Sequence, residues 1–193
     1  MVEYAPIPGY PEYNRLVSSL VFGENSKAIS SDQIALVQSL SGTGALRVGA
    51  DFIKRFWPNK TIYIPNPTWP NHNGVFNASD LKIKQYRYYN PKTIGLDIDG
   101  MLEDLAHADE ASVVLLHACA HNPTGVDPSR DEWGRIAKIV QERRLLVFFD
   151  AAYLGFASGD YDNDAFSIRY FVDQGITLLL ALSFAKNMVL FFP

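Results

Sequence analysis

Two charged residues each follow an apolar stretch that has the length of a buried strand. Asp150 closes the run 145–149, and Lys186 comes shortly after the run 177–182. Open α/β sheets bind ligands at the carboxyl ends of their strands, and a carboxylate buried there needs a partner. A lysine held in an apolar cleft can attack carbonyl groups, although most lysines are surface cations. Asp150 is equally compatible with a helix N-cap, so neither residue decides its role alone.

A glycine-containing turn, Ser41-Gly42-Thr43-Gly44, opens a predicted amphipathic helix over residues 45–57. Free backbone N–H groups and the helix dipole at such a place favour a phosphate group. The turn matches neither the dinucleotide-binding Gly-x-Gly-x-x-Gly pattern nor the Walker pattern with its lysine. It therefore indicates an anion-binding turn of another kind, or simply a turn.

Two further loops follow predicted strands. Trp69 lies between Pro67 and Pro70, which suggests a rigid loop that presents an aromatic face, with a core tryptophan as the alternative. Asn122 begins the turn Asn122-Pro123-Thr124-Gly125. Asn66–Pro67 and Asn122–Pro123 are both candidates for cis peptide bonds.

The elements that must position these residues alternate along the chain. Apolar spacing predicts helices over 10–22, 45–57, 96–106, 128–143 and 164–174, with Pro128 as a first helical residue, and strands over 33–40, 61–64, 84–89, 112–116, 145–149 and 177–182. Strands that alternate with helices of this length form βαβ units with right-handed crossovers. The pattern predicts an α/β fold with a mainly parallel sheet.

Composition narrows the class of protein. At 193 residues and 48% hydrophobic content, one globular domain is expected. The net charge of −4 comes without a basic stripe, which argues against a nucleic-acid partner. The longest apolar run, 176–181, is too short to cross a membrane, and the start of the chain resembles no targeting segment. A single cysteine, Cys119, agrees with a reducing compartment.

Taken together, the motifs resemble those of the fold-type I pyridoxal phosphate enzymes, and specifically the aspartate aminotransferases. The resemblance covers almost the whole chain and rests on Glu3-Tyr4-Ala5-Pro6-Ile7, Ser41-Gly42-Thr43-Gly44-Ala45-Leu46-Arg47, Pro67-Thr68-Trp69, Asn71-His72, residues 117–125, Phe149-Asp150-Ala151-Ala152-Tyr153, residues 155–159 and Ser183-Phe184-Ala185-Lys186-Asn187. It implies a three-layer sandwich in which residues 1–193 form part of the large, cofactor-binding domain.

The resemblance also implies roles for residues around the cofactor ring. Lys186 would hold pyridoxal 5'-phosphate as a Schiff base and later move the proton at the substrate's α-carbon. Asp150 would pair with the protonated pyridine nitrogen and keep the ring an electron sink. Tyr153 and Asn122 would hydrogen-bond the phenolic oxygen, and Trp69 would stack on the ring.

Further residues would complete the site by the same resemblance. Gly42, Thr43 and Ser183 would hold the phosphate, joined by Tyr4, which reaches into the neighbouring subunit of the family homodimer. His72 would support Asp150 from behind. The two cis prolines of the family fall on Pro67 and Pro123.

The chain departs from the family after Lys186. Where the family continues through Gly-Leu-Tyr to a phosphate-binding arginine, this sequence reads Met188-Val189-Leu190-Phe191-Phe192-Pro193. The arginines that bind the substrate carboxylates and the small C-terminal domain would also lie outside the chain. Leu154 stands where a glutamine is common.

Three interpretations follow: transamination between L-aspartate and 2-oxoglutarate, an aromatic amino-acid aminotransferase, or a non-catalytic remnant that at most binds cofactor. The partners would be amino acids and 2-oxo acids, with no metal, and the compartment would be cytoplasmic or mitochondrial. We expect five adjacent parallel strands, with 35–40 lacking its usual neighbour, an unpaired edge on the last strand and exposed apolar surface. Turnover of aspartate by the isolated chain should be undetectable or nearly so.

Overall fold

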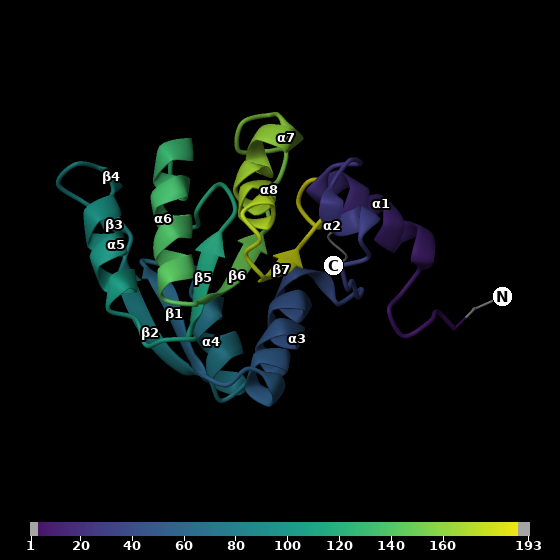
Figure 1. The fold of residues 1–193 in the computed structure, drawn as a ribbon, viewed down its shortest axis with the longest axis horizontal. Coiled ribbons are helices and arrows are strands. Elements are labelled where there is room, and N and C mark those ends of the chain that lie inside the picture. Colours follow the sequence, from purple (N-terminus) through teal and green to yellow (C-terminus); the bar gives the residue numbers. More distant parts are fainter. Residues whose placement is uncertain (1–3, 189–193) are drawn as a thin grey trace.

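The computed structural model describes residues 4–188 and shows a parallel sheet between two layers of helices (Figure 1). The strand order β2–β1–β5–β6–β7 puts the sequence-adjacent pair β1 and β2 at one side. The strands are β1 Thr61–Asn66, β2 Lys82–Arg87, β5 Val113–His117, β6 Leu146–Ala151 and β7 Leu178–Leu182. All four pairings are parallel, which confirms the predicted α/β fold with five adjacent parallel strands.

Helices cover both faces of the sheet. One face carries α5 Ile98–Ala106, α6 Arg130–Glu142 and α8 Phe166–Asp173, and the other carries α3 Ser41–Phe56 and α4 Asn71–Ala78. Outside these layers lie α1 Pro11–Phe22, α2 Lys27–Ser30, α7 Tyr161–Asp164 and the short antiparallel hairpin of β3 Tyr89–Asn90 and β4 Gly95–Leu96. The arrangement is the expected three-layer sandwich.

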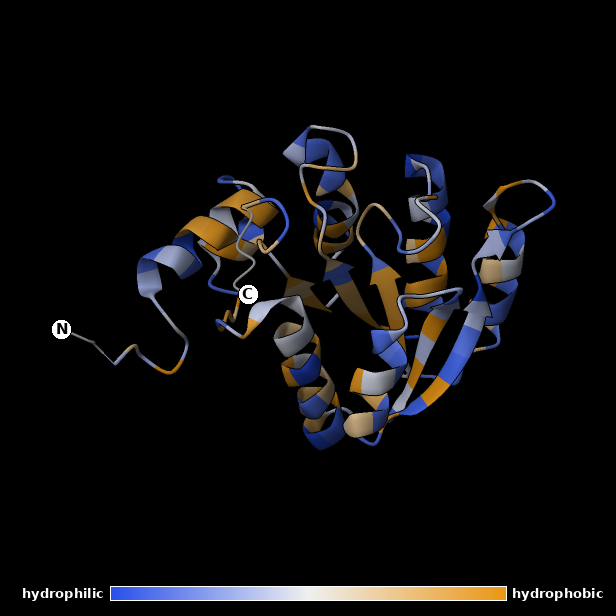
Figure 2. Ribbon diagram, turned by 180° about the vertical axis from the view of Figure 1, so that it is seen from behind, coloured by the Kyte–Doolittle hydropathy of each residue, from blue (hydrophilic) through white to orange (hydrophobic). Residues whose placement is uncertain are grey.

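Side chains alternate between two apolar cores along each central strand. Val113 and Leu115 of β5 pack toward α3 and α4, whereas Val114 and Leu116 pack toward α5 and α6. Because both faces are covered, the central strands β5 and β6 are largely apolar, as Figure 2 shows, whereas the edge strand β2 is largely hydrophilic. This double burial explains why the runs in the sequence were continuous rather than alternating.

Local sequence signals account for several helix ends. Gly23, with φ at 84°, ends α1 where the sequence predicted a stop. The helix α6 begins at Arg130, two residues later than predicted, because Ser129 and Glu132 form a capping box at its start. Pro128 therefore precedes the helix cap, and its predicted place as a first helical residue is wrong.

Other predicted boundaries also moved. The helix predicted over 96–106 begins at Ile98, since Asp97 accepts a bond from the Gly100 N–H and caps it, and Leu96 belongs to β4. The strand predicted over 84–89 is shifted to 82–87. The helix predicted over 164–174 corresponds to α8, which begins at Phe166 after the short helix α7. The helix α4 follows Trp69 directly and was not predicted, because its short sequence shows weak amphipathic spacing.

The predicted strand over 33–40 is not present. Residues 33–39 have no regular structure, and their backbone bonds include Gln38 N–H to the Pro8 carbonyl rather than a sheet ladder. A strand needs a neighbour, and none of the described residues provides one here. On the described residues β7 pairs with β6 alone, so its other edge is unpaired, as expected.

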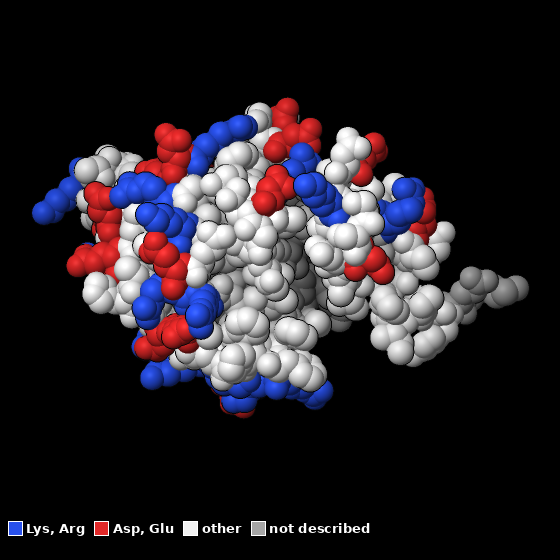
Figure 3. All heavy atoms as spheres, viewed as in Figure 1, with Lys and Arg blue, Asp and Glu red and all other residues white. Residues whose placement is uncertain are grey.

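Acidic and basic side chains intermingle on the surface shown in Figure 3. Several form exposed ion pairs that link β2, α5 and α6, including Arg87 with Asp104 and Arg135 with Asp99. Exposed pairs of this kind contribute about 0–1 kcal/mol each, so the two cores carry most of the stability. None of the described helices has the length and hydropathy needed to span a membrane.

Candidate functional site

A cavity of about 310 Å³ lies at the carboxyl ends of the central strands, beside the first turn of α3. Among its lining residues are Gly42, Thr43, Trp69, Asn122, Asp150, Tyr153, Ser183 and Lys186, which the sequence had singled out. They come from five separate segments that the parallel topology brings to one edge of the sheet. The cavity is also lined by Ser41, His117 and Cys119, which the sequence analysis had not assigned.

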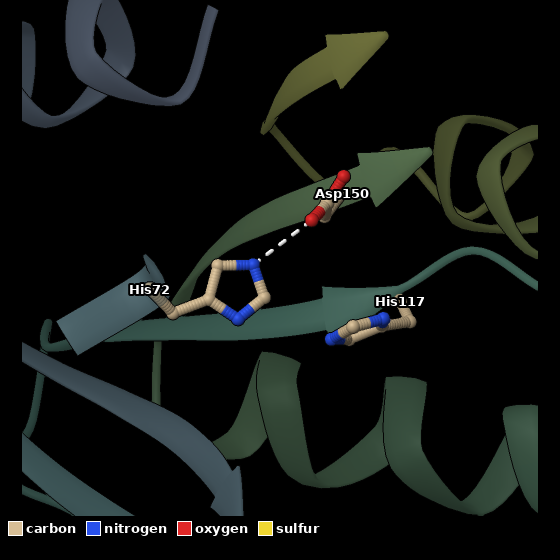
Figure 4. A group of neighbouring side chains, drawn as sticks. All are labelled: His72, His117 and Asp150. Atoms are coloured by element: carbon tan, nitrogen blue, oxygen red, sulfur yellow. Dashed lines mark hydrogen bonds and ion pairs between the residues drawn. The ribbon is translucent and has the colours of Figure 1, made fainter. Parts of the chain in front are cut away.

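Asp150 lies within β6 rather than at a helix cap, and its partner is His72. The Oδ2 atom of Asp150 is 2.9 Å from Nε2 of His72, whose Nδ1 is in turn 2.7 Å from Thr68 Oγ1. His72 is completely buried on α4, and its ring points at the carboxylate (Figure 4). This hydrogen-bonded chain fixes the carboxylate and leaves its second oxygen, Oδ1, toward other partners.

His117 closes β5 and lies beside this pair (Figure 4). Burial lowers its pKa well below the usual value, helped by the neighbouring rings of His121 and His72, so it is neutral at neutral pH. Its Nε2 is buried without a hydrogen-bond partner among the described residues. The sequence signal for His117 was its place directly after the apolar run 112–116, but no role was predicted from it.

His72, His117 and Asp150 also offer three ligand atoms within 4.8 Å of one another. Zinc sites use residues of these types, but there the ligand atoms surround an ion that lies between them. Here the direct contact between His72 Nε2 and Asp150 Oδ2 satisfies both atoms. The arrangement is that of a hydrogen-bonded support for Asp150.

The first turn of α3 supplies uncapped donors to the cavity. The first N–H groups of a helix have no partner within it, and no side chain caps those of α3. Ser41 Oγ lies 3.3 Å from Ser183 Oγ, so hydroxyl groups from two segments meet at this turn. A side chain at Gly42 would bring its Cβ to 3.1 Å from Ser183 Cβ, which explains a glycine here. The turn can bind an anion.

Lys186 faces Tyr153 across the cavity. Its Nζ lies 3.9 Å from the centre of the Tyr153 ring and has no hydrogen-bond or ion-pair partner within residues 4–188. The neighbouring Asn187 donates from Nδ2 to the Leu154 carbonyl at 3.2 Å, which ties the lysine segment to the loop after β6. The amine is thus held in the cavity without being neutralised by a carboxylate.

The remaining predicted residues fall as follows. Both Asn66–Pro67 and Asn122–Pro123 are cis, as predicted. Trp69 is partly buried, packs against the core on the α3 and α4 side, forms a T-shaped contact with the His72 ring at 5.3 Å and also lines the cavity. Tyr4 is fully exposed and does not line the cavity of its own chain.

Cys119 shares the cavity wall with Asn122. Burial raises the pKa of its thiol, and the nearby carboxylates of Asp164 and Asp127 add to this effect. A protonated thiol is a poor nucleophile, so Cys119 is a packing residue of the wall at neutral pH.

Comparisons with known proteins agree with this geometry. The family model described as aminotransferase class I and II matches residues 1–191. The cytoplasmic aspartate aminotransferase of Oryza sativa subsp. japonica is 54% identical over 98% of this chain and 46% of its own length. The mitochondrial aspartate aminotransferase of Dictyostelium discoideum is 53% identical over 98% of this chain and 44% of its own.

A solved structure shows the same backbone. The aromatic-amino-acid aminotransferase of Burkholderia pseudomallei, covalently bound to pyridoxal phosphate, superposes with a TM-score of 0.96 at 37% identity, over 98% of this chain and 47% of that one. The fold is therefore that of a pyridoxal phosphate-dependent transferase. The chain belongs to the aminotransferase class I and II family, and it spans slightly under half the length of the relatives it matches.

Proposed function

We propose that this chain is the cofactor-binding part of an aminotransferase that moves an amino group between L-aspartate and 2-oxoglutarate. The observation that carries the proposal is the meeting of Lys186, Asp150 and the uncapped turn of α3 in one cavity. An amine, a supported carboxylate and an anion-binding turn correspond to the aldehyde, the ring nitrogen and the phosphate of pyridoxal 5'-phosphate. The similarity to aspartate aminotransferases from two organisms supports the choice of substrate.

The cofactor, when bound, supplies an aldehyde for amine exchange and a ring that stores electrons. Lys186 Nζ would hold it covalently and carry a proton to and from the substrate's α-carbon. Asp150, fixed by His72, would keep the proton on the pyridine nitrogen. Tyr153 and Asn122 would donate to the phenolic oxygen, and Trp69 would cover the ring face.

The first turn of α3 would hold the phosphate. Gly42 and Thr43 would donate to it from the uncapped turn of α3, and Ser183 would add a hydroxyl group. Its two negative charges would also favour this end through the helix dipole. We thus propose a separate partner for each part of the cofactor.

Substrate choice and assembly go beyond this chain. A preference for aromatic amino acids is the second candidate, favoured by the likeness to the aromatic-amino-acid aminotransferase. We propose a homodimer in which the exposed Tyr4 reaches the site of the partner subunit, and in which exposed apolar residues such as Phe52 and Phe56 of α3 are covered within the complete protein. A cytoplasmic or mitochondrial location fits the relatives.

A two-stage measurement tests the proposal. The chain should bind pyridoxal phosphate, seen as an imine absorbance band, while transaminating aspartate at an undetectable rate. A protein extended by the segments that the relatives contain should transaminate aspartate faster than phenylalanine. A preference of the extended protein for phenylalanine would favour the second candidate, and an isolated chain with a turnover of about 10 per second, the median for enzymes, would refute the need for further segments.

A further inference from the structure

A buried carboxylate outside the cavity holds the loop that follows β6. Asp164, at the end of α7, is 5% exposed. Its Oδ2 accepts from the N–H groups of Gly155 at 2.8 Å and Ala157 at 3.0 Å, and its Oδ1 accepts from the Ser158 N–H at 3.1 Å. Three backbone donors thus converge on one carboxylate.

Asp164 has no cationic partner within residues 4–188, where none of its contacts is an ion pair. A buried carboxylate is costly unless hydrogen bonds replace its hydration, and bonds to a charged acceptor are about twice as strong as neutral ones. The three amides therefore compensate the charge, and the charge in turn fixes the loop. The segment held in this way is irregular, with φ angles of 86° at Gly155 and 79° at Gly159.

The held loop begins at the cavity wall. The Phe156 N–H donates to the Tyr153 carbonyl at 2.9 Å, so the turn that Asp164 fixes starts at Tyr153 itself. The carbonyl of Leu154 accepts from Asn187, which follows Lys186. The position of the Tyr153 ring beside Lys186 Nζ is thereby connected to the loop that Asp164 holds, through one backbone hydrogen bond and one hydrogen bond from the Asn187 side chain.

We propose that Asp164 is a positioning residue, whose carboxylate holds residues 153–158 so that Tyr153 points into the cavity beside Lys186. The inference rests on the proposed function only for what Tyr153 does there, which is to donate to the cofactor. The geometry of the loop itself belongs to the chain without cofactor, and it can be measured in that state.

Amide hydrogen exchange tests the loop. Asp164→Ala removes all three acceptors and should raise exchange at Gly155, Ala157 and Ser158 by about tenfold or more. Asp164→Asn can keep its one oxygen toward Gly155 and Ala157, but its NH₂ group then faces the Ser158 N–H. We therefore expect Asp164→Asn to affect Ser158 most.

Two variants serve as controls. Asp173→Asn removes an exposed carboxylate from α8, and Ile168→Val destabilises the buried face of the same helix without touching the loop. Neither should raise exchange at the three amides selectively. Exchange in Asp164→Ala that matches Ile168→Val would show that the carboxylate does not hold the loop, and it would overturn the proposal.

The ring current of Tyr153 tests positioning without cofactor. The side-chain protons of Lys186 should be shifted in the NMR spectrum of the chain, and Tyr153→Leu should remove that shift. Asp164→Ala should move the resonances toward those of Tyr153→Leu, whereas Ile168→Val should leave them. Unchanged Lys186 resonances in Asp164→Ala would reduce Asp164 to a structural role and refute the inference.

A cofactor measurement separates this inference from the proposed function. In the chain loaded with pyridoxal phosphate, Asp164→Asn should raise the pH midpoint of the absorbance change in the direction of Tyr153→Phe. Failure of the unaltered chain to bind the cofactor would count against the proposed function, while the exchange and ring-current results would still decide the role of Asp164. A bound cofactor with an unmoved midpoint would overturn the positioning role alone.

Discussion

The strand-end cavity and the N-terminal segment 4–40 obey different constraints. In the cavity, Asp150 is held within the buried strand β6, and His72 is fully enclosed beside it. In the N-terminal segment, Ile7 is 96% exposed and Leu40 is 91% exposed, although both are apolar. The difference shows that an apolar residue predicts packing only where the chain itself supplies the neighbour.

Removing core volume should have the largest effect on stability. Phe148 is buried on β6 and fills the space above Gly49, where a Cβ would come to 2.4 Å from its ring. Phe148→Ala should lower the free energy of unfolding by about 3–5 kcal/mol. Leu40→Ala in the N-terminal segment should change it by about 0.5 kcal/mol or less. Urea unfolding of both variants measures the contrast, and equal losses would break the comparison.

Removing the carboxylate of the buried pair Asp150 and His72 at the cavity should have the next largest effect. Asp150→Ala removes the carboxylate from His72 and from the expected pyridine nitrogen, so we expect cofactor affinity to fall by about 30-fold or more. Asp150→Glu keeps a carboxylate near both groups and should cost less. Cofactor titration followed by absorbance measures both variants, and equal affinities would argue against the pairing.

Lowering the pH should destabilise the folded chain through the buried histidines at and after the end of β5 before the surface carboxylates are protonated. Burial lowers the pKa of His121 from 6.5 to about 4, and the pKa of His117 is also well below its usual value. Between about pH 6.5 and 4 the unfolded chain binds more protons at these histidines than the folded chain. Their contribution to the free energy of unfolding is therefore fully present above about pH 6.5 and is lost as the pH decreases toward 4. His121 can account for at most about 3 kcal/mol of this loss.

Unfolding curves at several pH values check this expectation. His121→Gln removes the group that titrates and should flatten the dependence between pH 6.5 and 4. Lys138→Ala on the exposed face of α6 provides a control that should keep the full slope. A constant stability from pH 7 to pH 4.5 in the unaltered chain would contradict the burial argument.

The smallest effect is expected in the segment without sheet partners. Val37 is 50% exposed in a stretch that the sequence predicted as a strand. Val37→Lys should change the free energy of unfolding by about 0.5 kcal/mol or less, and it should reduce aggregation because it interrupts exposed apolar surface. Light scattering at increasing protein concentration measures the second effect. A large loss of stability would show that Val37 packs against a neighbour after all.

The same contrast explains what the sequence could predict. Most of the parallel strands were predictable because each contains a continuous apolar run that needs two covered faces, as in 145–149, whereas the largely hydrophilic β2 was predicted with shifted bounds. The strand predicted over 33–40 is not present in the structure, because its apolar residues carry the same local signal without a partner strand. Local periodicity contains no information about whether that partner exists.

The site residues also divide into those that the sequence could predict and those that it could not. Lys186, Asp150 and Asn122 were found because each lies at or beyond the carboxyl end of an apolar run, and parallel topology gathers strand ends. His117 and Cys119 were missed, since their roles depend on burial between neighbouring strands, which lowers the pKa of one and raises that of the other. Asp164 was missed for another reason: its partners are backbone amides, which leave no mark on the side-chain pattern.

The central claim is that Lys186 is the amine that holds the cofactor, because it alone of the lysines lines the described cavity. Borohydride reduction of the chain with pyridoxal phosphate, followed by peptide mapping, tests this directly. We predict a single stoichiometric label on Lys186 that disappears in Lys186→Ala and persists in Lys138→Ala. A label on Lys54 or Lys138 instead would contradict the account.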